Sequence, residues 1–459
     1  MPRPTFTSYM AMPLARHNLS QSSQSYSVRA PAWLQKLVSD VTKGPKLYAW
    51  TIENLEAHRQ KRDTKLELHT RNLVQADATK RVHILGIGNL GRLYATSLAN
   101  LGEAPITLVL HRKGLLEQWA SEPAIEITRR GVTERVENFD VEWWTEEKPP
   151  VGPVREVCRG CSISNLIVST KAPDALPQVD RLRRYLDAKS TVAFVQNGMN
   201  RLWPPNGAIY NDKRFLPNQH PNWIHCVTTH GVTSLGPLKS IHASPADIAM
   251  GPVSLNPETR DCSDYLVEQI LRAPHLSARA VPTSALWVLQ LEKLVVNSTI
   301  NPLTALLRCK NGSLFSESGD SASEKVMDLL IDEASLVLQA LVQHPSSREI
   351  LADSSFPDTG THESVDRMAL LARFSPARLR AMLHHVGEKV KDNTSSMLQD
   401  VTSGKQTEIR EFNGWFVDMA EYLGLETPNH KVICDLVENS GQVLGQDQLG
   451  RHFPAINKL

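Results

Sequence analysis

The feature that most constrains the fold is a glycine-rich turn placed between two apolar runs. Residues 82–85 are suited to a short buried strand, residues 92–101 to a helix that ends at Gly102, and residues 106–110 to a second strand. The turn between the first strand and the helix consists of Gly86, Ile87, Gly88, Asn89, Leu90 and Gly91. A strand, a GxGxxG turn, a helix and a strand in this order predict an α/β domain of the Rossmann type.

The three glycines have separate roles in such a turn. Gly86 permits the tight turn, Gly88 allows the backbone to approach a pyrophosphate, and Gly91 allows the helix to pack closely on the strand. The N-terminus of the helix then faces the phosphates. We therefore predict a dinucleotide site here. The alternative is a glycine-rich turn with no ligand.

The residues after the second strand distinguish between the two nicotinamide dinucleotides. NAD sites carry Asp or Glu at this position, where the carboxylate binds the ribose 2′-hydroxyl. Here the residues are His111, Arg112 and Lys113, and basic side chains suit a 2′-phosphate. The sequence thus favours NADP (as NADPH), although the same residues also fit a solvated basic turn.

Polar residues follow two later apolar runs, at 165–169 and 191–195. In an open parallel sheet, the carboxyl ends of the strands line the ligand crevice. Lys171 and Asn197 stand at these ends and are candidates to contact the nicotinamide half of the cofactor or the substrate, although either would be unremarkable as a loop residue. Further candidate strands are residues 224–229 and 248–253.

A second cluster lies on a helical segment that begins at Ser284. Lys293, Asn297 and Asn301 are spaced four residues apart, which places them near one face of a helix. The surrounding residues are apolar, so burial would lower the pKa of Lys293 toward neutrality and suit it to proton donation. The alternative is a lysine that reaches solvent beside two amides. Pro302 predicts a kink or an end of this helix at Asn301.

A third cluster comes near the C-terminal end. The polar run 393–400 contains Ser396, and Glu408 directly precedes an amphipathic helix that stops at Gly424. Glu408 is therefore a candidate site residue, or else only a favourable partner of the helix dipole.

Composition limits the class of protein. Lys plus Arg number 50 and Asp plus Glu 49, for a formal charge of +1, which argues against a nucleic acid held by overall charge. No uncharged apolar run reaches the roughly 18 residues of a membrane span. Cys158 and Cys161 form a CxxC, but no second CxxC or close His pair completes a zinc set. We predict a structural role for this motif and no metal site.

The N-terminal region differs from the rest. Residues 1–39 contain no Asp or Glu and are rich in Arg and Ser, which is typical of a mitochondrial transit peptide. A disordered leader on a cytoplasmic protein is the alternative. We expect residues 1–80 to be leader and linker. The proline-rich segment 203–222 and the segment 316–362, which has a helical pattern at 326–342, have the composition of surface insertions.

Together the three clusters resemble the ketopantoate reductase family. The matching strings run in family order over about residues 81–450, and they are Gly-Ile-Gly-Asn-Leu-Gly, Ser-Thr-Lys-Ala, Gln-Asn-Gly-Met, Leu-Glu-Lys-Leu-Val-Val-Asn-Ser-Thr-Ile-Asn-Pro-Leu, Asn-Gly-Ser-Leu, Ser-Ser-Met-Leu-Gln-Asp and Thr-Glu-Ile-Arg-Glu-Phe-Asn-Gly. The resemblance implies an NADP-binding Rossmann domain over residues 81–281. It also implies an all-α C-terminal domain of the 6-phosphogluconate-dehydrogenase-like kind over residues 282–459, with the active site between the two.

The activity implied by the resemblance is NADPH-dependent reduction of 2-dehydropantoate to (R)-pantoate, a step toward pantothenate and coenzyme A, with a homodimer as one possible assembly. By the same resemblance, Lys293 matches the general acid, and Glu408 matches a carboxylate near it. The positions that match cofactor contacts are the glycine turn, Arg112, Lys171, Asn197 and Val232. Those that match substrate contacts are Asn197, Asn297, Asn301, Asn311 and Ser396.

Two alternatives remain open. The first is an NADP-dependent reductase of another small 2-keto acid, or of an imine, on the same scaffold. The second is a noncatalytic mitochondrial regulatory protein that kept the fold, which would be expected to have lost Lys293 or Glu408.

Overall fold

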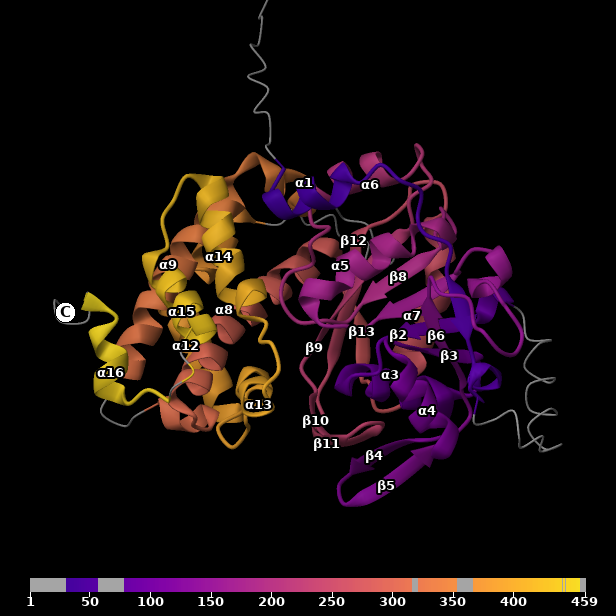
Figure 1. Cartoon of the computed structure of the whole chain (residues 1–459). Helices are drawn as coiled ribbons and strands as arrows, with labels where there is room; N and C mark the ends of the chain where they lie inside the picture. The colour runs from indigo at the N-terminus through magenta and orange to yellow at the C-terminus, as the bar shows by residue number, and fades with distance from the viewer. Residues whose placement is uncertain are drawn as a thin grey trace, which may run out of the picture.

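The chain forms a sheet domain and a helical domain that lie side by side (Figure 1). A computed structural model describes residues 30–56, 78–315, 321–352, 366–439, 441 and 443–454. The predicted fold class, a Rossmann-type α/β domain followed by an all-α domain, is confirmed. Among the residues described, no helix is both long enough and apolar enough to cross a membrane.

The sheet domain is built on a nine-stranded sheet whose six central strands, β6 to β9 across the sheet, run parallel. Strand β3 pairs with one edge of β2, and β7, which comes later in the chain, pairs with the other edge. The strand order therefore reverses direction at β2. The carboxyl ends of these strands therefore enclose the crevice in which open α/β sheets bind ligands. In spatial order the strands are β1 (Tyr48–Trp50), β6 (Asp140–Thr145), β3 (Ile106–Leu110), β2 (Val82–Leu85), β7 (Asn165–Val168), β8 (Thr191–Phe194), β9 (Asn222–Thr228), β12 (Ile248–Ser254) and β13 (Ala278–Ala280).

Helices cover both faces of this sheet, which is why its strands are continuous apolar runs. Successive side chains of one strand enter different cores. Ile84 packs on the side of α3, α4 and α7, and Leu85 packs on the side of α5 and α8. The helices are α3 (Asn89–Leu101), α4 (Lys113–Ser121), α5 (Ala172–Arg181), α7 (Asp264–Arg272) and α8 (Thr283–Leu307).

A second, four-stranded sheet lies beside the first. It contains β10 (Gly231–Gly236), β11 (Lys239–Ser244), β4 (Ile125–Arg129) and β5 (Val132–Val136), in that spatial order. Helix α3 contacts β10, β11 and β4, so the helix that follows the glycine turn is held between the two sheets.

The helical domain is organised around α8, which contacts β9 and β12 as well as its helical neighbours. The long helix therefore joins the two domains. The other helices are α9 (Ala322–Gln343), α10 (Arg348–Ala352), α11 (Arg367–Arg373), α12 (Pro376–Lys389), α13 (Ser396–Thr402), α14 (Ile409–Leu423), α15 (Pro428–Asn439) and α16 (Gln446–Arg451).

Pro302 predicted a kink or an end of the helix at Asn301, and the second of these, an end, is wrong, because α8 continues to Leu307. Proline has no N–H, so the carbonyl of Ser298, four residues earlier, loses its helical partner. Asn413 on α14 supplies the missing donor, since its Nδ2 lies 2.8 Å from Ser298 O. A tertiary contact thus replaces the lost backbone bond, and Asn301 stays helical.

Both segments predicted to be surface insertions contribute to the core. Helix α9 confirms the helical pattern at 326–342, but Val326 and Val337 are fully buried, so α9 is central to the helical domain rather than an insertion. In the segment 203–222, Tyr210 on α6 (Asn206–Arg214) is also fully buried. Residues 316–320 and 353–362 lie outside the described residues.

Part of the expected leader and linker belongs to the fold. Strand β1 pairs antiparallel with β6 at the sheet edge, because Ala49 and Trp50 are apolar and become buried there. Helix α1 (Ala32–Ser39) contacts α6. Residues 1–29 and 57–77 lie outside the described residues.

Candidate active site

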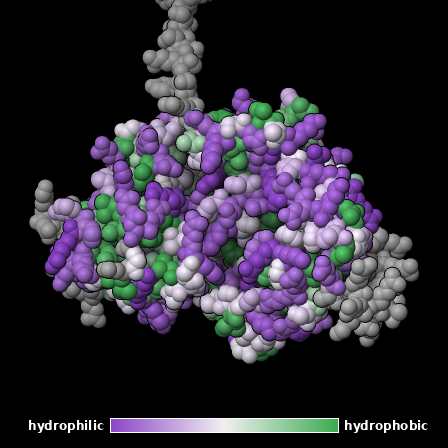
Figure 2. All heavy atoms as spheres, in the orientation of Figure 1, coloured by the Kyte–Doolittle hydropathy of each residue, from purple (hydrophilic) through white to green (hydrophobic). Residues whose placement is uncertain are grey.

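A cleft of about 1410 Å³ lies where the two domains meet. The glycine turn, the ends of β7 and β8, and strand β10 line it on one side, and α8, α12 and α13 line it on the other. In Figure 2 the molecule is hollowed near the centre of the visible face, and hydrophilic residues surround the hollow. Apolar side chains also line the cleft, namely Leu289, Val296, Ile300, Met382, Val386 and Val390.

The glycine turn has the geometry of a phosphate-binding turn. Gly86 has a φ of +90°, and a Cβ on Gly91 would lie 2.3 Å from Gly86 O, so the backbone itself requires glycine at both positions. At Gly88 the nearest atom to an added Cβ is 3.9 Å away, and φ is −64°. Neither packing nor conformation requires glycine at Gly88, whereas a ligand that approaches the start of α3 does. The residues present therefore fit a dinucleotide.

Polar side chains connect this turn to the second sheet. Asn89 donates from Nδ2 to Val232 O on β10 at 3.0 Å, and both residues line the cleft. Arg92 is buried and donates to Ile87 O at 2.9 Å and to Lys239 O at 2.6 Å. These bonds hold the turn in place without help from a ligand.

Lys293 lies in the cleft on α8 and bridges to the sheet domain. Its Nζ donates to Asn197 Oδ1 at 2.8 Å and to Thr228 O at 2.6 Å. Burial lowers the pKa of Lys293 from 10.5 to about 8, against the opposing influence of Glu408. An ammonium has three donors, so one N–H is left for a substrate oxygen. Lys293 is half-buried, and its two bonds to the sheet domain hold the ammonium in the cleft, where it could donate a proton to a bound substrate.

Glu408 also crosses between the domains. It occupies the cap position before α14 but makes no side-chain cap bond; instead Oε1 accepts from Ala172 N at 2.9 Å. Burial raises the pKa of this carboxyl, and the nearby Lys171 opposes the rise. Lys171 itself pairs with Asp400 on α13, with 2.5 Å between Nζ and Oδ2. The loop after β7 is thus held by two carboxylates of the helical domain.

Asn197 lies on the wall formed by the sheet domain, and the other four predicted substrate-contacting side chains lie together on the opposite wall. Asn297, Asn301, Asn311 and Ser396 all line it, and Asn301 Nδ2 lies 3.4 Å from Ser396 Oγ. Asn301 is helical and lies about two turns after Lys293 on the same face of α8. Among the residues that the structure describes, three cleft-lining polar atoms are buried without a protein partner, and a polar ligand would satisfy them: Thr170 Oγ1, Gln196 Oε1 and Asn311 Oδ1.

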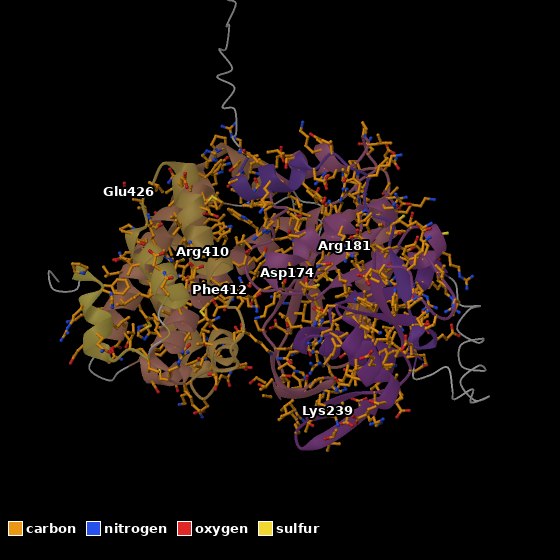
Figure 3. All side chains as sticks on the ribbon, viewed as in Figure 1. Asp174, Arg181, Lys239, Arg410, Phe412 and Glu426 are labelled. Carbon is orange, nitrogen blue, oxygen red and sulfur yellow. The ribbon has the colours of Figure 1, made fainter. Side chains whose placement is uncertain are left out.

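Two predicted residues, Gly91 and Arg112, do not line the cleft. His111 lines the cleft, whereas Arg112 caps α4 and is exposed. One face of α5 lines the cleft instead and was not predicted. Figure 3 labels two of its residues, Asp174 near the start of α5 and Arg181 at its end.

Other site residues also escaped the sequence analysis. Asp400 belongs to a string that matched the family, so its position pointed to the site although no role was assigned. The carbonyl of Thr228 carries no sequence signal, because any residue can supply a backbone oxygen.

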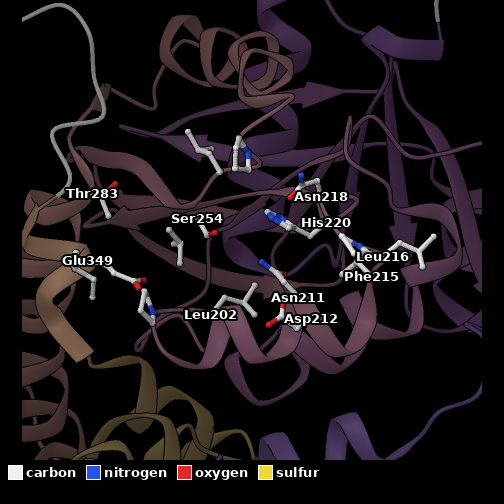
Figure 4. A pocket seen from close by; sticks show the side chains of 17 residues that line it. Leu202, Asn211, Asp212, Phe215, Leu216, Asn218, His220, Ser254, Thr283 and Glu349 are labelled. Atoms are coloured by element: carbon white, nitrogen blue, oxygen red, sulfur yellow. The ribbon is translucent and has the colours of Figure 1, made fainter. Parts of the chain in front are cut away.

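A second pocket, of about 670 Å³, lies between α6, the end of β12 and α10 (Figure 4). Asn211, Asp212, His220 and Glu349 are among the residues that line it. It includes none of the predicted site residues and none of the unpartnered buried polar atoms. The cleft between the domains is therefore the candidate active site.

The CxxC contributes nothing to this site. Cys158 and Cys161 are both free cysteines, in the turn that precedes β7. Across the described ranges, no three His, Cys, Asp or Glu residues come together as a metal site.

The fold and the cleft define the class of protein. It has a sheet domain of the dinucleotide-binding type and a helical domain that places a lysine in the cleft between them. A family model described as "Ketopantoate reductase PanE/ApbA" matches residues 82–254, and one described as "Ketopantoate reductase PanE/ApbA C terminal" matches residues 285–440. The chain belongs to the ketopantoate reductase family of 2-keto-acid oxidoreductases.

The names of similar proteins differ in the keto acid that they give. A protein of Beauveria bassiana named ketoisovalerate reductase is 40% identical over 456 residues, covering 92% of this chain and 98% of its own length. A probable 2-dehydropantoate 2-reductase of Schizosaccharomyces pombe is 26% identical over 367 residues, covering 78% of this chain and 95% of its own. Among solved structures, D-mandelate dehydrogenase with NADH and anilino(oxo)acetate shares the fold, with a TM-score of 0.54 at 15% identity, covering 78% of this chain and 97% of that one.

Proposed function

We propose that this chain uses NADPH to reduce a small branched 2-keto acid to its 2-hydroxy acid, with Lys293 as proton donor. The observation that carries the proposal is the setting of Lys293, an ammonium of lowered pKa in the same cleft as the glycine turn. With a pKa of about 8, the group is mostly protonated at neutral pH and still gives up its proton readily.

The chemistry assigned to the chain is proton supply and charge stabilisation. The reduced nicotinamide, when bound, supplies a hydride to the keto carbon. The electron pair of the C=O bond moves to oxygen, and the free N–H of Lys293 stabilises that charge and then protonates it. Asn197 and Thr228 accept the other two N–H groups, so the ammonium is held in place before the reaction begins.

We propose 2-ketoisovalerate as the substrate. The relative with 40% identity over nearly its whole length carries that name. An isopropyl group requires an apolar surface, and α8 and α12 present one in the cleft through Leu289, Val296 and Met382. Asn301 and Ser396 supply polar groups for the carboxylate.

2-Dehydropantoate is the second candidate, and (R)-pantoate for coenzyme A synthesis would then be the product. It carries a hydroxymethyl group that 2-ketoisovalerate lacks. The unpartnered Oδ1 of buried Asn311 favours this candidate, because a substrate hydroxyl would satisfy it.

NADPH is proposed over NADH because of the basic residues after β3. The glycine turn would hold the pyrophosphate, and Arg112, together with Lys113, would hold the 2′-phosphate of the ribose. The fold does not decide the matter, since D-mandelate dehydrogenase shares it and was solved with NADH.

The experiment compares kcat/KM for the two keto acids, and the oxidation of NADPH is used to monitor each reaction. An apolar pocket tolerates an added hydroxyl, with discrimination up to about 10²-fold, whereas a pocket built to bind a hydroxyl rejects the analogue without it by about 10⁴-fold or more. We expect 2-ketoisovalerate to be used at least as well as 2-dehydropantoate. A preference for 2-dehydropantoate of about 10³-fold or more would select the second candidate.

A further inference from the structure

Gln290 makes contacts that parallel those of Lys293, one helical turn earlier on α8. It is 2% exposed, and its Nε2 donates to Gly198 O at 2.8 Å and lies 2.8 Å from His225 Nε2. Lys293 contacts Asn197, next to Gly198, and Thr228, on the same strand as His225. Both side chains therefore bridge α8 to the same two segments, the turn after β8 and strand β9.

The orientation of the Gln290 amide is fixed by chemistry. Trp203 Nε1 is only a donor, so the atom 2.6 Å from it must be Gln290 Oε1. Nε2 then faces Gly198 O, which is only an acceptor, and its second hydrogen faces His225. Burial, with the nearby Lys293, lowers the pKa of His225 to about 3, so the ring is neutral and can accept from Gln290 at Nε2; its Nδ1 lies 3.4 Å from Asn200 Nδ2.

The turn that Gln290 holds is the one that carries Asn197. Gly198 has a φ of +79°, and a Cβ there would lie 3.1 Å from Glu411 O, so the turn is also closely packed against α14. Trp203, the residue that orients Gln290, begins the segment 203–222, which the sequence suggested was a surface insertion. It is 5% exposed and contributes to the wall behind the site.

We propose that Gln290 is a positioning residue for Lys293: it fixes the turn after β8 and strand β9, which carry the two acceptors of the Lys293 ammonium. An apolar side chain in its place would leave Trp203 Nε1, Gly198 O and His225 Nε2 without partners in a buried region. These groups would then draw in water, and the acceptors of Lys293 would no longer be fixed. The role of Lys293 as proton donor is that of the proposed function, on which this inference rests.

The test uses Gln290→Met, which keeps the length of the side chain and removes its three polar contacts. We expect kcat for 2-ketoisovalerate to fall about 10- to 100-fold with KM changed less than about 3-fold, because the loss concerns alignment rather than binding. Water near the ammonium should also raise the pKa of Lys293 from its value of about 8 toward that of an ordinary lysine.

That second effect can be measured without a substrate. Acetic anhydride modifies the neutral amine of Lys293, and peptide mass spectrometry measures the rate of this modification. The dependence of that rate on pH gives the pKa of Lys293. The midpoint should rise by roughly half a pH unit or more in Gln290→Met. The matched control is Gln269→Met, on α7, where another buried glutamine bonds to Glu103 outside the cleft. The control should change neither kcat nor the labelling midpoint.

Three results would overturn the inference. The first is an unchanged kcat in Gln290→Met, and the second is a fall in its activity with no change in the labelling midpoint. The third is an equal effect of Gln290→Met and Gln269→Met. If Gln290→Met does not fold, Trp203→Phe is the second test, since it keeps an aromatic ring but removes the Nε1 donor that orients Gln290, together with part of the indole. It should shift the labelling midpoint in the same direction, and no shift would refute the proposal. Absence of keto-acid reduction in the wild type would refute the proposed function but leave the labelling result to judge Gln290.

Discussion

Replacing Lys293 by Met should remove catalysis without weakening the fold at neutral pH. In the folded chain, burial lowers the pKa of Lys293 from 10.5 to about 8, so the protonated form is disfavoured relative to the unfolded chain. Linkage gives a cost to folding of about 3 kcal/mol at pH 7. The cost is complete well below the folded pKa and shrinks as the pH rises toward the unfolded value, reaching about 1.4 kcal/mol at pH 9.5.

Methionine keeps the packing of the lysine stem and avoids this cost. The variant also loses two hydrogen bonds, to Asn197 and Thr228. Each lost bond lowers the free energy of unfolding by about 1 kcal/mol, which offsets part of the gain from removing the charge. The free energy of unfolding of Lys293→Met should therefore equal or exceed that of the wild type at pH 7. The difference, variant minus wild type, should fall by about 2 kcal/mol between pH 7 and pH 9.5.

Urea unfolding of both proteins at the two pH values measures that difference. Activity is measured on the same samples, and kcat should drop by roughly 10²–10⁴-fold. A stability difference that does not change with pH would refute the reasoning, because it would show that the Lys293 ammonium is not desolvated in the folded chain.

The remaining predictions concern the cofactor and the N-terminus. Arg112→Asp should reduce the preference for NADPH over NADH, as judged by the ratio of kcat/KM values; a wild type that uses both equally well would show the basic-turn argument to be wrong. Gly88→Ala should leave the melting temperature nearly unchanged but weaken dinucleotide binding about 10-fold or more, since the added methyl would meet only the ligand. Gly91→Ala should instead destabilise the fold, because its Cβ would lie 2.3 Å from Gly86 O. We also propose mitochondrial import of the N-terminal segment. A mature protein that begins soon after Arg29 supports this, and an intact N-terminus in the cytoplasm contradicts it.

Local signals were sufficient to predict the dinucleotide-binding unit. The run 82–85, the glycine turn and the run 106–110 each follow from neighbouring residues, and the structure places β2 and β3 at those bounds. The spacing of Lys293, Asn297 and Asn301 likewise predicted a shared helix face, and the cleft confirms it.

Features that depend on distant contacts were not predictable in this way. Pro302 is a helix breaker by local rules, and only Asn413, from another helix, makes its position acceptable. Helix α9 and Trp203 looked peripheral because polar, glycine- or proline-rich residues flank them, whereas their burial depends on tertiary packing. Strand β1 is short, and its pairing with β6 leaves no signal beyond a few apolar residues.

Within the site, residue types were predictable and partners were not. The sequence predicted Lys293 and Glu408 as candidate site residues. It did not predict that Glu408 would accept a hydrogen bond from the Ala172 backbone or that Lys171 would pair with Asp400. Backbone acceptors and cross-domain pairs appear only once the two domains are placed together.

The most direct test of the account is NADPH oxidation by the purified chain with 2-ketoisovalerate, measured in parallel for the wild type and Lys293→Met. We predict rapid turnover by the wild type, formation of the 2-hydroxy acid, and a loss of kcat of roughly 10²–10⁴-fold in the variant, with dinucleotide affinity nearly unchanged. Equal turnover by the two proteins would contradict the assignment of Lys293 as the proton donor. No turnover by the wild type with either keto acid would contradict the proposed reaction itself.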